Sequence, residues 1–151
     1  MRRGLAISAV ILGILLTGEA FSRWYLGLGD PPLTVRDPEI EYMFAPNQDV
    51  RRFGNRVAYN AWSMRSDPVA PRKPHPREFR MLVMGDSVIN GGALTDQTRL
   101  ATTLAQARLS SSDHPAFVGN VSAGSWGPEN GLGSPVRLVR GRSGGRGPEY
   151  P

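Results

Sequence analysis

The sequence has no cysteine and only two histidines among its 151 residues. Without cysteine the chain can form no disulfide bond, and it offers no thiolate to a metal ion. Structural and catalytic zinc sites need three or four side-chain ligands, and histidine is the main source once cysteine is missing. The sequence therefore implies neither a metal site nor a cofactor.

Acidic residues are also few, with 13 against 18 lysines and arginines, for a formal net charge of +5. Most of this excess is terminal. Residues 133–151 contain four arginines and one glutamate, a net of +3, and Arg2 and Arg3 account for the other +2. Because the positive charge does not form a patch within the central part of the chain, we expect no nucleic-acid partner.

Residues 1–28 have the pattern of a signal peptide or a transmembrane anchor. Arg2 and Arg3 precede a nearly unbroken apolar run, as in export segments. Small residues near position 20 suit a cleavage site, whereas an uncleaved anchor would have to include Glu19 and Arg23 within the membrane. In either case the charge asymmetry predicts a cytoplasmic N-terminus. The rest of the chain is then membrane-anchored on the extracytoplasmic (periplasmic) side, or exported.

Two segments of different composition follow. Residues 29–66 are rich in aromatic residues and valine, with asparagine and glycine breaks, and predict a β-rich N-terminal extension. Within it, residues 50–53 and 57–62 predict a hairpin, because the glycine and asparagine between them tolerate a tight turn. Residues 67–78 carry four prolines among basic residues and predict an extended linker.

After the linker the pattern changes to that of an α/β protein. Residues 79–84 form a short apolar run, typical of a strand that is buried on both faces. A helix capped by Thr95 or Asp96 is predicted to extend to Leu109, with leucines at helical spacing. Residues 117–121 predict a second buried strand. Strand, helix and strand at this spacing predict a right-handed βαβ unit in a parallel sheet.

Both predicted strands end in a cluster of small and polar residues. Gly85, Asp86 and Ser87 follow the first strand, and residues 120–128 span the end of the second. In open α/β sheets, functional groups gather beyond the carboxyl ends of the strands. A serine on such a turn exposes its hydroxyl as a nucleophile, and backbone N–H groups at the neighbouring strand end can bind an oxyanion.

These two clusters resemble blocks I and II of the SGNH (GDSL-type) hydrolases, in particular their membrane-anchored or exported bacterial members. The resemblance covers about residues 19–132. It implies that residues 79–132 are the N-terminal part of a flavodoxin-like, three-layer αβα fold with a parallel sheet.

The resemblance also implies roles for individual residues. Ser87 would be the catalytic nucleophile. The oxyanion-hole amides would come from Ser87, Gly124 and Ser125, and the turn would be supported by Gly85, Asp86 and Asn90. Family members usually carry glycine five positions after the block II asparagine, where this chain has Ser125. The choice between the Gly124 and Ser125 amides therefore stays open.

The resemblance stops before the catalytic machinery is complete. The family's block III asparagine and its late Asp-x-x-His, which supplies the base, have no counterpart. His75 lies in the linker and His114 in a polar loop, neither with an aspartate three residues before it. We interpret both as ordinary loop histidines. Residues 133–151, rich in glycine, arginine and proline, predict a disordered tail, which we interpret as a shifted reading frame or a gene-prediction artefact.

Two functions of different class are consistent with this sequence. The first is a serine esterase that acts on O-acyl ester bonds of envelope glycans or lipids, and that is inactive or slow as this chain because the base is missing. The second is a non-catalytic, membrane-tethered remnant or interaction module. The expected partners are an acylated small-molecule or glycan substrate and the membrane.

Overall fold

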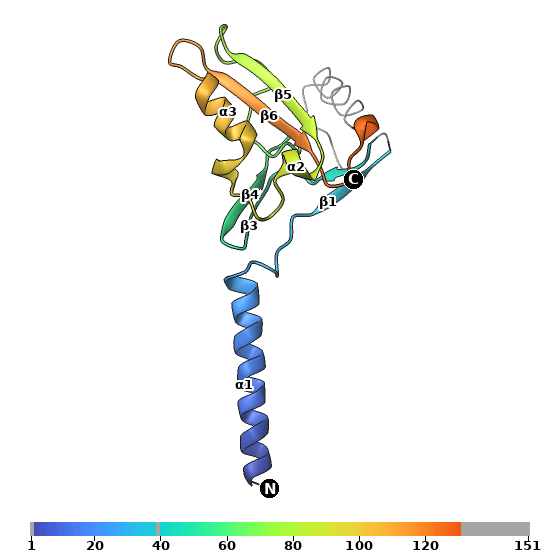
Figure 1. Ribbon diagram of the computed structural model, residues 1–151, viewed down its shortest axis with the longest axis vertical. Coiled ribbons are helices and arrows are strands. Elements are labelled where there is room, and N and C mark those ends of the chain that lie inside the picture. The colour runs from blue at the N-terminus through green and yellow to red at the C-terminus, as the bar shows by residue number, and fades with distance from the viewer. Residues whose placement is uncertain (1, 39, 131–151) are drawn as a thin grey trace.

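The computed structural model describes residues 2–38 and 40–130. A long helix projects from a small head, the name used here for the described residues after this helix, 25–38 and 40–130 (Figure 1). The described part of the head contains three two-stranded sheets, of which one is parallel. The expected mixture of helices and strands is thereby confirmed, although only one pair of the described strands is parallel. The predicted tail, residues 133–151, lies outside the described residues.

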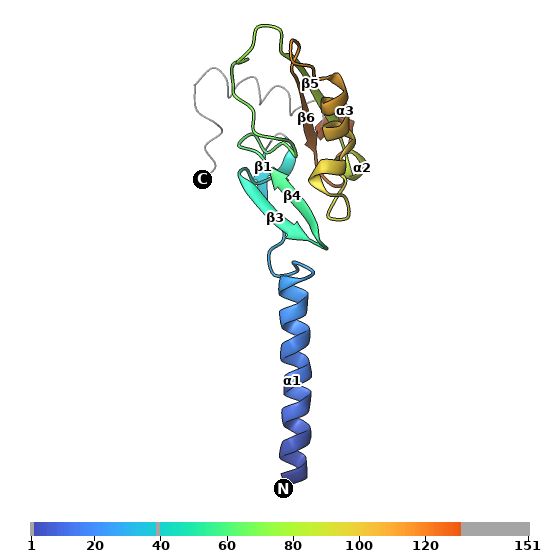
Figure 2. The same ribbon diagram turned by 90° about the vertical axis from the view of Figure 1, so that its left-hand side faces the viewer.

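Helix α1 (Arg2–Trp24) confirms the apolar helix predicted at the N-terminus. With a mean hydropathy of 1.9 it is long and apolar enough to cross a membrane, a property that it shares with signal sequences. It stands apart from the head in both views (Figures 1 and 2). Glu19 and Arg23 pair along the helix, with 2.5 Å between Oε1 and Nε. This pairing lowers the cost of placing either charge near lipid.

The segment after α1 forms two antiparallel hairpins, as its composition predicts. Strands β1 (Thr34–Asp37) and β2 (Glu41–Phe44) form the first, and β3 (Gln48–Arg52) and β4 (Asn55–Tyr59) form the second. The predicted β3–β4 hairpin is confirmed, but its second strand stops at Tyr59 and does not reach residue 62.

Asn60 ends this strand. Its Oδ1 accepts hydrogen bonds from the backbone N–H groups of Trp62 (2.9 Å) and Met64 (3.1 Å). A side chain that satisfies nearby backbone donors in this way competes with the sheet ladder and turns the chain.

The strand–helix–strand unit is present after the linker. Strands β5 (Phe79–Gly85) and β6 (Ala116–Ser122) pair in parallel over seven residues each. Between them lie α2 (Ser87–Asn90), the 3₁₀ helix η1 (Gln97–Arg99) and α3 (Ala101–Leu109). Within the described residues no further strand joins this pair, so the wider flavodoxin-like sheet stays a prediction.

The two parallel strands differ in burial, and the expectation for the first was wrong. Every residue of β6 from Phe117 to Ser122 is buried, whereas β5 has no buried residue. The outer edge of β6 is covered: Arg65 N–H donates to the Asn120 carbonyl (2.9 Å), and Asn120 N–H donates to Ser66 Oγ (2.7 Å). No such cover is present along the outer edge of β5 in the part of the chain that the structure describes.

The predicted helix over residues 95–109 is divided into two pieces. Asp96 caps η1 by accepting the Thr98 N–H (3.0 Å), and Leu100 is then extended (ψ 141°) before α3 begins. Leu100 is buried, but Leu104 and Leu109 are about half exposed, so the leucines do not form one buried stripe. The interruption at Leu100 shifts the phase of the repeat.

The main hydrophobic core lies between β6, the β1–β2 hairpin and the segment that follows β4. Its buried members are Ile40, Met43, Met64, Phe117, Val121, Ala123 and Trp126. Trp126 also donates its indole N–H to the Tyr42 carbonyl (3.0 Å). The β-rich extension therefore packs directly against one strand of the parallel pair.

Candidate active site

Ser87 lies on the turn directly after β5, as the first residue of α2. Asp86 is the N-cap of α2, and its Oδ1 accepts the Val88 N–H at 2.9 Å. Gly91, with φ of +77°, closes the single helical turn by donating its N–H to the Ser87 carbonyl (2.9 Å). The Ser87 side chain is exposed and makes no hydrogen bond to any described residue. Its hydroxyl is therefore accessible to a substrate from solvent.

Gly85 is required at the end of β5 because the helix folds back onto it. A Cβ atom at Gly85 would lie 2.4 Å from Cγ1 and 2.8 Å from Cβ of Ile89. Contacts this short do not occur between real atoms, so any larger residue would displace α2. The glycine before the serine therefore sets the position of the turn.

The second predicted cluster lies at the same edge of the sheet. Gly85 and Ser122 are register partners at the carboxyl ends of β5 and β6. Gly124 and Ser125 follow two and three residues later, and their amide N–H groups have no hydrogen-bond partner among the described residues. The Gly124 carbonyl accepts a hydrogen bond from the Tyr42 hydroxyl. Unpaired N–H donors at the same sheet edge as an exposed serine are one requirement of an oxyanion hole.

Asn90, predicted to support the turn, cross-links α2 to β6. It is buried, and its Nδ2 donates to the Ser122 carbonyl at 3.0 Å. From the other side Asn120 donates its Nδ2 to the Ile89 carbonyl at 2.8 Å. These two amides hold the turn that carries Ser87 against the buried strand.

Arg65 is a further residue at this site, and the sequence did not point to it. Its side chain is fully buried, and its guanidinium donates to three backbone carbonyls, those of Asn90 (2.6 Å), Gly92 (2.5 Å) and Thr95 (2.6 Å). It therefore fixes the loop that follows α2. Burial lowers the pKa of Arg65 from its usual value, although a guanidinium still keeps its proton at neutral pH. Arginine is seldom fully buried, and no pattern around position 65 marks it.

Tyr59 completes the buried polar cluster. Its hydroxyl donates to Asn90 Oδ1 at 3.3 Å, and its ring stacks on Phe44 with 4.2 Å between centroids. Burial raises the pKa of Tyr59 to about 12, so the phenol stays neutral over the physiological range. Its role is therefore structural support of Asn90.

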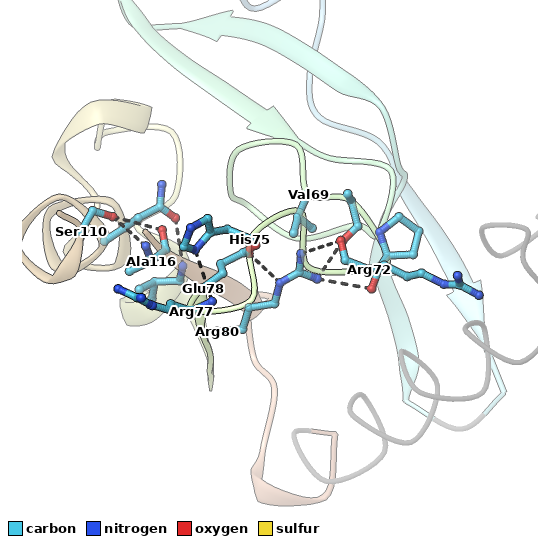
Figure 3. A network of polar contacts seen from close by, with 12 residues as sticks. Val69, Arg72, His75, Arg77, Glu78, Arg80, Ser110 and Ala116 are labelled. Carbon is cyan, nitrogen blue, oxygen red and sulfur yellow. Dashed lines mark hydrogen bonds and ion pairs between the residues drawn. The ribbon is translucent and has the colours of Figure 1, made fainter. Parts of the chain in front are cut away.

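Both histidines lie at the opposite end of the parallel pair from Ser87. His75 precedes β5, and its Nδ1 accepts the Arg77 N–H at 3.2 Å (Figure 3). His114 precedes β6, and its backbone N–H donates to Ser111 Oγ at 3.2 Å. The strands between the two ends are about 20 Å long. Neither histidine of this chain can therefore serve as the base for Ser87.

A cavity of about 290 Å³ lies elsewhere, over the β3–β4 hairpin and the residues that follow it. Its lining includes Asp49, Arg56, Tyr59 and Asp67, and none of the predicted site residues. Asp49 and Arg56 form a bidentate ion pair at its rim, which lowers the pKa of Asp49. Because Ser87 does not line this cavity, an ester substrate bound there would not contact the Ser87 hydroxyl.

No group of three or more histidine, cysteine or carboxylate side chains that could hold a metal ion occurs within residues 2–38 and 40–130. Comparisons of the chain with protein-family models, with curated proteins and with solved structures gave no match. The interpretation of the site therefore depends on the geometry described above.

Proposed function

We propose that this chain contains a membrane-anchored domain of the SGNH serine-hydrolase type, with Ser87 as the nucleophile toward O-acyl ester bonds. The observation that supports this function best is that one sheet edge carries both an exposed Ser87 hydroxyl without a hydrogen-bond partner and the Gly124 and Ser125 amides, which have no partner among the described residues. The substrate class is an acylated small molecule, glycan or lipid of the cell envelope.

In the proposed reaction, Ser87 Oγ forms a bond to the acyl carbon, and the hydroxyl proton passes to a base. The Ser87 amide and a second amide from Gly124 or Ser125 bind the oxyanion. When the intermediate collapses, the bond between the acyl carbon and the alcohol oxygen breaks, the base returns its proton to that oxygen, and the acyl group stays on Ser87 until water hydrolyses it. Because both histidines lie at the other end of β5 and β6, this chain supplies no imidazole for the proton transfer. We expect slow acylation by this chain alone.

The proposed location is the extracytoplasmic side of a membrane. Helix α1 supplies the anchor, and Arg2 and Arg3 at its start favour a cytoplasmic N-terminus. The head would then lie outside the cytoplasm, where acylated envelope components are found.

Acyl transfer to Ser87 tests this function directly. The full chain in detergent micelles is incubated with p-nitrophenyl acetate and imidazole, which replaces the missing base, and the acetylated peptide is identified by mass spectrometry. We expect acetylation of Ser87 that depends on imidazole and that disappears in Ser87→Ala. Ser112→Ala, which removes an exposed loop serine, is the matched control and leaves the Ser87 adduct unchanged. Equal acetylation of Ser87 and Ser112 would rule out an activated serine.

A second candidate function is a non-catalytic, membrane-tethered remnant or interaction module. It is favoured by the position of both histidines and by the open outer edge of β5 in the described residues. This function predicts that Ser87 reacts no faster than any other exposed serine of the chain.

A further inference from the structure

The end of α1 would lie at the surface of a membrane that this helix crosses. Its 23 residues rise by about 1.5 Å each, roughly 34 Å in total, against about 30 Å for the hydrocarbon core of a bilayer. Trp24 is 88 % exposed at its last position, and Tyr25 follows it and stacks on Phe21. Tryptophan and tyrosine are the residues that favour the lipid headgroup level.

The tip of the β3–β4 hairpin is held at the same level as this helix end. Phe53 donates its backbone N–H to the carbonyl of Leu26, only two residues after α1, at 2.9 Å. A Cβ atom at Gly27 would lie 1.8 Å from the Arg51 carbonyl oxygen, so the two segments are in close contact. Both views show the hairpin as the part of the head that approaches α1 (Figures 1 and 2).

The hairpin tip has the chemistry of a lipid contact. Phe53 is a bulky residue with φ of +51°, which is unusual for a side chain of its size, and it is 44 % exposed. The Arg52 guanidinium lies 5.6 Å from the centre of its ring, and Arg51 beside it is exposed. Neither arginine forms an ion pair with a described residue. An aromatic ring beside arginines suits the interface of a bilayer that contains anionic phospholipids.

We propose that the β3–β4 tip docks on the headgroup layer of the membrane that α1 crosses, with Phe53 entering the interface and Arg51 and Arg52 contacting anionic lipid phosphates. The inference depends on the proposed anchoring by α1, and it is independent of catalysis at Ser87. Docking at the tip gives the head a second contact with the membrane. It thereby restricts rotation of the head about residues 25–33, which connect α1 to β1.

The absence of cysteine allows a direct test, because a single introduced cysteine carries a single spin label. The full chain is placed in vesicles containing phosphatidylglycerol, with labels at Leu12→Cys in α1, Arg51→Cys near the tip and His75→Cys in the linker at the other end of the head. Accessibility to a water-soluble nickel complex is measured by electron paramagnetic resonance. We expect the label at position 51 to be several-fold less accessible than the one at position 75.

The outcomes separate anchoring from docking. If the label at position 12 is open to the nickel complex, α1 does not cross the membrane and the inference fails with the anchor. If position 12 is protected but position 51 is as open as position 75, docking alone is overturned.

A second variant shows whether lipid contact causes the protection at position 51. Adding Phe53→Ser and Arg52→Ser is expected to raise its accessibility to that of position 75. Adding Phe79→Ser, which removes an equally exposed ring at the start of β5, is the matched control and leaves it unchanged. Persistent protection without Phe53 and Arg52 would show that the backbone contact with Leu26 shields the label, and would overturn the lipid contact.

Discussion

Strands β5 and β6 are both short apolar segments and pair in register along their whole length, yet one is exposed and the other buried. The difference comes from their other neighbours. The outer edge of β6 is covered by Arg65 and Ser66, and one of its faces packs into the main core. The outer edge of β5 has no such cover in the described part of the chain. Burial of a strand is thus decided by segments distant in sequence.

The largest effect is expected from removing the buried Arg65 side chain, which holds the loop after α2. Arg65→Ala removes the donor from the carbonyls of Asn90, Gly92 and Thr95 and opens a cavity where the buried side chain was, which costs about 3–5 kcal/mol of unfolding free energy. Arg51→Ala, at an exposed position, is expected to cost less than about 0.5 kcal/mol. Urea unfolding of the full chain in micelles measures both, and similar costs for the two variants would contradict the structural role of Arg65.

A smaller effect on the unfolding free energy is expected from substitutions within β5 and β6, and it should differ between the two strands. Val118→Ala in β6 removes buried methyl groups and is expected to cost about 2–3 kcal/mol of unfolding free energy. Leu82→Ala in β5 removes a side chain that is 42 % exposed and is expected to cost less than about 1 kcal/mol, although it deletes more atoms. The same unfolding measurement compares them. A larger loss in Leu82→Ala than in Val118→Ala would contradict the difference in burial between the two strands.

The last effect appears only at high pH and concerns the buried phenol of Tyr59, at the end of β4. The pKa of Tyr59 is raised to about 12, against about 10 in an unfolded chain, so the neutral phenol contributes stability that is complete below pH 10. This contribution is lost as the pH rises toward 12, because the unfolded state ionises first. Ultraviolet titration is expected to show one late-ionising tyrosine that is absent from Tyr59→Phe. If the absorbance that Tyr59→Phe loses belongs to an ionisation near pH 10 and not near pH 12, Tyr59 is not buried as described.

Much of the local structure was predictable from the sequence. The apolar runs located α1, β5 and β6, and the glycine and asparagine located the β3–β4 turn. The errors arose where a distant side chain or a single local bond decided the outcome. Asn60 ends β4 early, and Leu100 interrupts the predicted helix.

For the candidate site, sequence reasoning named the residues on the two turns but missed those that support them. Gly85, Asp86 and Ser87 form the expected turn, and Gly124 and Ser125 lie at the same sheet edge. Arg65 could not be found, because its three carbonyl partners become neighbours only after folding. The catalytic roles themselves remain predictions.

The three residues Gly85, Asp86 and Ser87 are under different constraints, and this has an evolutionary consequence. The glycine is fixed by the space that Ile89 occupies, and the aspartate by its cap on α2. Both would be kept by selection for folding alone. The serine hydroxyl has no structural partner among the described residues, so a lineage without acyl transfer is free to replace it. In descendants of such a gene, replacement of Ser87 with Gly85 and Asp86 unchanged would mark the lineage in which selection for acyl transfer ended.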